Sequence, residues 1–152
     1  MRVSAKVDYA VRAAIELAAS NGDGLVKAEQ IASAQDIPRK FLDNILQGLR
    51  QAGLIESRRG PDGGHRLACP AGDVAIADII RAIDGPLANV GGRSPESVEF
   101  PGPAEPLREV WVALRVSLRE VLENVTVADV VSGKLPPAVC DKLDVPGAWQ
   151  RR

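Results

Sequence analysis

A nine-residue segment, Arg58-Arg59-Gly60-Pro61-Asp62-Gly63-Gly64-His65-Arg66, constrains the fold of this 152-residue chain more than any other. Apolar residues flank it on both sides, with Leu54-Ile55 before it and Leu67 after it. Asp62-Gly63 is a strong two-residue turn signal, because glycine reaches positive φ angles without steric cost. The segment therefore predicts a β-hairpin that carries arginines at its tip.

A helix-turn-helix unit is predicted immediately upstream of this hairpin. A short helix from about Ala28 to Ala34 is followed by a turn at residues 35–37. Pro38 fits the first position of the next helix, which needs no N–H donor, and Gly53 suits its left-handed C-cap. The second helix is expected to bury Phe41, Leu42, Ile45, Leu46 and Leu49. Such a unit followed by a hairpin is typical of a winged helix-turn-helix, which reads the major groove with its second helix and reaches the phosphates or minor groove with its wing.

Two further helices are predicted before residue 85. One spans residues 73–84, with isoleucines on one side. The other begins at an N-cap, Ser4, and is expected to end at residues 21–24. Its predicted buried stripe is Val7, Val11, Ala14, Ile15 and Ala18. Residues 85–106 hold five prolines and four glycines and predict an irregular loop, long enough to suggest a function.

A long helix is predicted to begin after Pro106. Its apolar residues are spaced 4-3-4-3-4, the pattern of a coiled-coil seam. This seam comprises Leu107, Trp111, Leu114, Leu118, Val121 and Val125. The seam could pack within its own chain. A helix of this length after a complete domain more often pairs with its copy, however, and a palindromic operator requires a two-fold dimer. We therefore expect a homodimer.

The predicted fold class is mainly α, a winged helix-turn-helix domain with a small β-hairpin wing and a long C-terminal dimerisation helix. The DNA-binding domain is expected over residues 1–84, and the Gly/Pro-rich, sensor-type loop over 85–106. Dimerisation helices are expected over 107–133, the last of them started by a capping box at residues 126–129. A loosely held C-terminal tail is expected over 134–152.

Composition narrows the class of protein. The net charge is −1, and the first 67 residues carry ten Lys/Arg against eight Asp/Glu. This distribution fits a site-specific binder with a local basic surface better than a protein that coats DNA. No apolar run approaches the length of a membrane span, and two cysteines, Cys69 and Cys140, are too few for a disulfide framework. We expect a cytoplasmic protein without membrane association or a signal peptide.

The outward face of the second helix of the unit carries side chains that can read bases. Arg and Lys can pair with guanine, Asn and Gln with adenine, and Asp can accept from the cytosine amino group. This face comprises Arg39, Lys40, Asp43, Asn44, Gln47 and Arg50. Taken alone, this face is better explained as an ordinary solvated helix face. Because the helix lies between a tight turn and a cationic hairpin, DNA reading is favoured.

The hairpin adds candidate DNA contacts at Arg58, Arg59, Gly60 and Gly63, since glycine lets a backbone approach a partner closely. His65 is the sole histidine, and neither a catalytic grouping nor metal-ligand spacing can be built around it. We therefore expect neither an enzyme nor a metal site. The expected role of His65 is a backbone or phosphate contact in the wing, or none.

Several motifs together resemble one known family, the bacterial winged-helix regulators typified by IscR, NsrR and CymR. The resemblance covers roughly residues 1–133, and the motifs occur in the family's order and spacing. They are Met1–Lys6, Tyr9–Val11, Ile37–Leu42, Leu49–Ile55, Arg59–Gly64 and Ala82–Gly85. The resemblance implies a homodimeric DNA-binding transcriptional regulator, usually a repressor, acting on double-stranded DNA with a palindromic operator.

The resemblance also implies residue roles. Arg59 matches a wing arginine that enters the minor groove, and Asp43 falls where related members use a glutamate to select cytosine. The positions that match the recognition helix are Arg39, Lys40, Phe41, Asp43 and Asn44, and those near the phosphate backbone are Ser4, Lys6 and Tyr9.

One departure from the family bears on the signal. Sensory members hold an iron–sulfur cluster on three cysteines in the loop before the long helix, whereas residues 85–106 here contain no cysteine and no histidine. Asp8 aligns with a carboxylate ligand of some members, but without thiolates a structural pair with Arg12 is expected. We expect no cofactor. A small-molecule effector or a protein partner would then supply the signal. Two alternatives to the main interpretation stay open. One is a cluster-free regulator controlled by a partner protein, and the other is a small-molecule-binding protein with weak DNA affinity.

Overall fold

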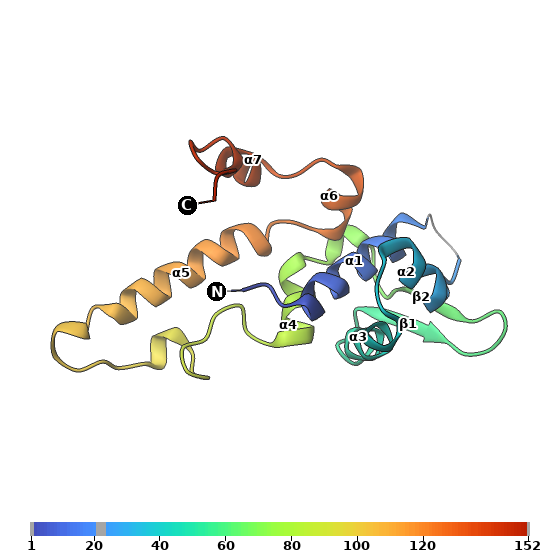
Figure 1. Cartoon of the computed structure of the whole chain (residues 1–152), viewed down its shortest axis with the longest axis horizontal. Helices are drawn as coiled ribbons and strands as arrows, with labels where there is room; N and C mark the ends of the chain where they lie inside the picture. The colour runs from blue at the N-terminus through green and yellow to red at the C-terminus, as the bar shows by residue number, and fades with distance from the viewer. Residues whose placement is uncertain (1, 21–23, 152) are drawn as a thin grey trace.

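The computed structural model describes residues 2–20 and 24–151. The predicted class is confirmed, because this part of the chain is mainly helical with one two-stranded antiparallel hairpin (Figure 1). The helices are α1 (Ala5–Ala19), α2 (Ala28–Gln35), α3 (Arg39–Gln51), α4 (Ile76–Asp84), α5 (Leu107–Leu122), α6 (Val127–Ser132) and α7 (Pro137–Leu143), and the strands are β1 (Ile55–Arg58) and β2 (Gly64–Leu67). The predicted stop of the first helix falls largely on residues 21–23, which lie outside the described residues.

Helix α1 is the centre of the domain, with α2, α3, α4 and α6 packed around it. Ser4 caps it as predicted, since its Oγ accepts a hydrogen bond from the Val7 N–H at 3.1 Å. The predicted stripe was partly wrong, because Val11, Ile15 and Ala18 are only partly buried. The residues that are buried are Val7, Ala10, Ala13, Ala14 and Leu17. The alanines let neighbouring helices approach closely, so the buried face is centred on the small residues.

Helix α3 buries four of the five residues predicted for its core face. Leu42, Ile45 and Leu49 are fully buried and Leu46 nearly so, but Phe41 is 54% exposed. One residue is a rotation of about 100° around a helix, which takes position 41 out of the buried arc. The turn before α3 is as predicted, with Asp36 in the left-handed region at φ 50° and Ile37 buried.

The hairpin differs from the predicted two-residue turn. The strands pair from Ile55 opposite Leu67 to Arg58 opposite Gly64, which leaves a five-residue loop at residues 59–63. Gly60, at φ 107°, supplies the positive φ angle, and the Gly63 N–H donates to its carbonyl at 3.0 Å. The sequence signal at Asp62-Gly63 marked the loop but not its length.

The C-terminal half divides differently from the prediction. The 85–106 segment runs outward from α4, and α5 returns alongside it toward the helices around α1 (Figure 1). This segment is not wholly irregular, because short 3-10 turns form at Pro95–Ser97 and Gly102–Ala104. Helix α6, capped by Thr126 as predicted, returns to α1, and its Val127 is fully buried in the domain core. Helix α6 therefore packs on α1 and not along α5.

One detail of the predicted apolar seam was wrong, the place of Val125. Helix α5 ends at Leu122, so Val125 lies beyond it, 7% exposed, with its carbonyl accepting from the Ile76 N–H at 2.9 Å. The tail forms α7, and Lys142 Nζ lies 3.6 Å from Glu120 Oε2 of α5. Among the described residues, no helix combines the length and the apolar character that crossing a membrane requires.

Replacing Gly63 with alanine should destabilise the wing. A Cβ built at this position lies 2.1 Å from the Arg58 carbonyl oxygen, so the hairpin backbone must move. We expect Gly63→Ala to lower the free energy of unfolding by about 1–3 kcal/mol, as overpacking does. Gly72→Ala, where a Cβ meets nothing within 4 Å, is the matched control and should change it by less than about 0.5 kcal/mol. Urea unfolding that gives the same midpoint for both variants would contradict this packing.

Candidate nucleic-acid interface

The outward face of α3 lies beside the hairpin. A cleft of about 300 Å³ separates them, with Asp43, Gln47 and Arg50 on the α3 side and Ser57 and His65 on the hairpin side. The hairpin is fixed to the start of α2 as well. Val26 and His65 exchange backbone hydrogen bonds of 2.8 Å in both directions. The helix-turn-helix and its wing are therefore held in a fixed relation.

An ion-pair network links α2 to the amino-terminal turn of α3. Arg39 pairs with Glu29 of α2, and its Nε donates to Asp43 Oδ1 at 3.0 Å. The hydrogen bond from Arg39 lowers the pKa of Glu29, and the bond to Glu29 raises the pKa of Arg39. The predicted candidates Arg39 and Asp43 thus lie together, and each orients the other. Lys40 and Asn44 are exposed on the same helix.

The wing tip presents Arg58, Arg59 and Gly60 to solvent. Lys27 Nζ donates to the Pro61 carbonyl at 2.7 Å and so ties the tip to the start of α2. Gly63 lies buried beneath the Arg58 backbone, so the structure places it where it shapes the tip rather than at the surface.

His65 is partly buried, and its Nδ1 lies 2.7 Å from Ser57 Oγ. Burial lowers the pKa of His65, and the nearby cations Arg39 and Arg50 lower it further. The neutral imidazole is therefore favoured at neutral pH. His65 therefore contacts Val26 through its backbone and Ser57 through its ring, and its predicted DNA contact stays a prediction.

The residues predicted near the phosphate backbone have separate roles. Ser4 is engaged within the fold, because its Oγ also donates to Asp84 Oδ2 at 2.7 Å. Lys6 and Tyr9 line a hollow of about 510 Å³ together with Phe41 and Asn44. The Tyr9 and Phe41 ring centroids lie 6.4 Å apart. Sequence reasoning missed this hollow, although an aromatic residue just outside the buried arc of α3 was a usable signal.

The predicted pair of Asp8 and Arg12 is present, with Arg12 Nη2 2.9 Å from Asp8 Oδ2. Arg12 also lies over the Tyr9 ring, 4.9 Å from its centroid, and donates to the Gln35 carbonyl at 2.6 Å. The pair therefore serves the junction of α1 and α2 and supports the aromatic hollow.

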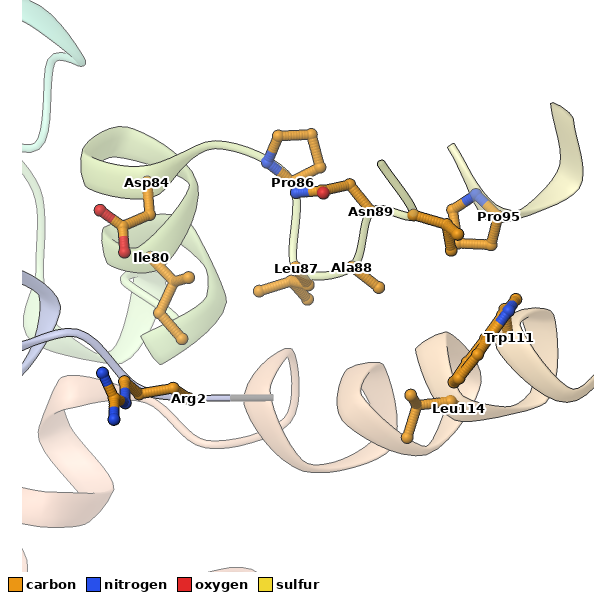
Figure 2. Close-up of a pocket in the computed structure, with 11 residues that line it drawn as sticks. Arg2, Ile80, Asp84, Pro86, Leu87, Ala88, Asn89, Pro95, Trp111 and Leu114 are labelled. Carbon is orange, nitrogen blue, oxygen red and sulfur yellow. The ribbon is translucent and has the colours of Figure 1, made fainter. Parts of the chain in front are cut away.

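The apolar seam of α5 is only half covered. Its five residues on the helix, Leu107, Trp111, Leu114, Leu118 and Val121, are all partly buried and none is fully buried. The 85–106 segment covers one flank through Pro95, which lies beside Trp111 (Figure 2). An ion pair also joins Arg115 of α5 to Glu96 of this segment. A cavity of about 490 Å³ lies between this segment, α4 and α5.

A sequence model of the Rrf2 family, described as an iron-dependent transcriptional regulator, matches residues 3–133. The chain belongs to the Rrf2 family. Rv1287 of Mycobacterium tuberculosis is 46% identical over 144 residues, which cover 95% of this chain and 89% of that protein. The HTH-type transcriptional regulator CymR of Bacillus subtilis is 34% identical over 132 residues, covering 87% of this chain and 91% of CymR.

Solved structures of Rrf2 relatives share the fold. CymR, described as the global cysteine regulator of B. subtilis, matches with a TM-score of 0.74 at 33% identity, over 88% of this chain and 98% of CymR. IscR of T. potens matches with a TM-score of 0.70 at 33% identity, over 88% of each chain. This Rrf2 protein is therefore a DNA-binding transcriptional regulator with a winged helix-turn-helix fold.

An iron–sulfur cluster does not fit the donor set of this Rrf2 protein, although the family is described as iron-dependent. Cluster irons are held mostly by thiolates. Cys69 lies partly buried just after β2, and Cys140 lies exposed on α7. Across residues 2–20 and 24–151, no group of three or more His, Cys, Asp or Glu side chains is placed to hold a metal ion. We therefore assign no role to a cluster.

Proposed function

We propose that this Rrf2 protein is a cytoplasmic, dimeric, sequence-specific repressor that binds a palindromic operator without an iron–sulfur cluster. The observation that carries the proposal is the placement of the outward face of α3 beside the wing. There, Arg39 lines one hollow with Arg58 and Gly60 of the wing, and Asp43 lines another with Ser57 and His65. Asn44 lies on the α1 side of the same helix, exposed beside Phe41. The resemblance to the family supports repression, since its members are usually repressors.

The half-covered seam of α5 supports the dimer. Leu114, Leu118 and Val121 lie on one side of the helix, and Val110 beside them is 55% exposed. An apolar stripe with coiled-coil spacing favours a second helix over water. Two copies joined there would present two recognition helices to two half-sites.

Regulation would enter through the cavity between α4 and α5. Its apolar lining includes Ile80, Leu87 and Trp111, and it adjoins both the DNA-binding domain and the dimer helix (Figure 2). A small molecule that fills it, or a protein that binds over it, would favour one tilt of α5 against α4. That preference would shift the population between operator-binding and non-binding forms.

Arg59→Ala tests the wing. We expect it to weaken operator binding by about 1–3 kcal/mol, most strongly on A·T-rich flanks, because a narrow minor groove attracts arginine. Arg66→Ala is the matched control, since it removes the same charge from the hairpin stem, where Arg66 pairs with Glu56 at 2.7 Å. The control should weaken binding to all flanks alike. Fluorescence anisotropy that gives Arg59→Ala the parent's affinity on every flank would exclude a reading role for the wing.

Leu118→Glu tests the dimer. A carboxylate buried without a partner costs several kcal/mol, so this variant should sediment as a monomer and lose operator binding together. Val116→Glu places the same charge on the opposite side of α5, where Val116 is 47% exposed, and it should remain a dimer. An intact dimer for Leu118→Glu would mean that the seam packs within one chain.

A further inference from the structure

We propose that Phe41, supported by Tyr9, is a receptor for the C5-methyl group of a thymine in the major groove. The protein would then require a T·A pair at one fixed position of each half-site. This inference rests on the proposed operator binding and names one feature that the operator must contain.

Phe41 is exposed, unlike the other large apolar residues of α3. The other large apolar residues of this helix, Leu42, Ile45, Leu46 and Leu49, are no more than 3% exposed, whereas Phe41 is 54% exposed. It lies in the first turn of α3, and the amino-terminal part of a recognition helix is the part that contacts base edges. Exposed aromatic surface at this point is available for an apolar group of a base.

The aromatic surface is held rigidly. The Tyr9 ring lies 6.4 Å from the Phe41 ring at an interplanar angle of 50°, so the two form a corner between α1 and α3. Arg12 lies over Tyr9 at 4.9 Å. Arg12 is itself fixed by Asp8 at 2.9 Å and by the Gln35 carbonyl at 2.6 Å. Because this chain of contacts fixes Tyr9, Phe41 keeps a defined position when DNA arrives.

The rim of the hollow matches a thymine edge. Lys6 supplies a cation suited to a flanking phosphate, and Asn44 supplies an amide that can pair with adenine through N6 and N7. Thymine is the only standard base with a methyl group in the major groove, and Phe is one of the side chains that contact it. A cytosine at the same place offers no methyl group, and uracil differs from thymine only by the lack of it.

Single thymine-to-uracil substitutions along the operator test the proposal, because each removes one methyl group and keeps base pairing. We expect one thymine in each half-site whose replacement weakens binding by the parent protein about fourfold, the effect of one buried methyl group. With Phe41→Ala, the same replacement should have no effect. Phe41→Leu, which keeps an apolar contact, should retain part of the discrimination.

Phe41 is half exposed, so Phe41→Ala should fold, and its thermal unfolding is compared with that of the parent. Two outcomes would overturn the inference while leaving the proposed function intact. One is that no thymine-to-uracil change alters the operator affinity of the parent protein, while Arg59→Ala still lowers that affinity. The other is that the discrimination persists in Phe41→Ala. The absence of any operator-specific binding by the parent would overturn both the proposed function and this inference.

Discussion

The packing of α3 against α1 determines which side chains of α3 stay exposed and so available to DNA. Leu42, Ile45 and Leu49 are fully buried, and burying one such side chain stabilises a fold by about 1.5–3 kcal/mol. The exposed pair of Arg39 and Asp43 contributes far less, since surface ion pairs are worth about 0–1 kcal/mol. The apolar face therefore sets the rotation of α3, and the ion pairs only adjust side chains on the face that remains outside.

The longest helix, α5, lies outside the DNA-binding domain, and its apolar side is only partly covered. Helix α6 packs on the DNA-binding domain, and its Val127 is fully buried there. Helix α5, which precedes α6 in the chain, has no fully buried residue. One copy of the chain thus completes the core of the DNA-binding domain, but it leaves the apolar side of α5 half covered. This division links function to assembly, because a second copy would both cover α5 and supply the second recognition helix.

Sequence patterns predicted the parts of this fold that depend on local chemistry. The caps at Ser4 and Thr126 and the left-handed Gly53 follow from side-chain and backbone preferences near in sequence. The predictions that were wrong concern contacts between residues far apart in the sequence. The burial of α1 is centred on alanines because several helices pack around it, and the hairpin loop is set by the contact of Gly63 with the Arg58 backbone. The hollow at Tyr9 and Phe41 required the relative placement of α1 and α3, which periodicity within one helix does not give.

Selection of binding sites from a random pool of double-stranded DNA tests the central claim most directly. A dimer with two equivalent reading surfaces should enrich an inverted repeat whose half-site centres lie about 10 base pairs, or a multiple of that, apart. A chain that reads DNA alone would enrich a single unrepeated motif, and a chain that contacts only phosphates would enrich none. Either of the last two results would contradict a dimeric, sequence-specific regulator.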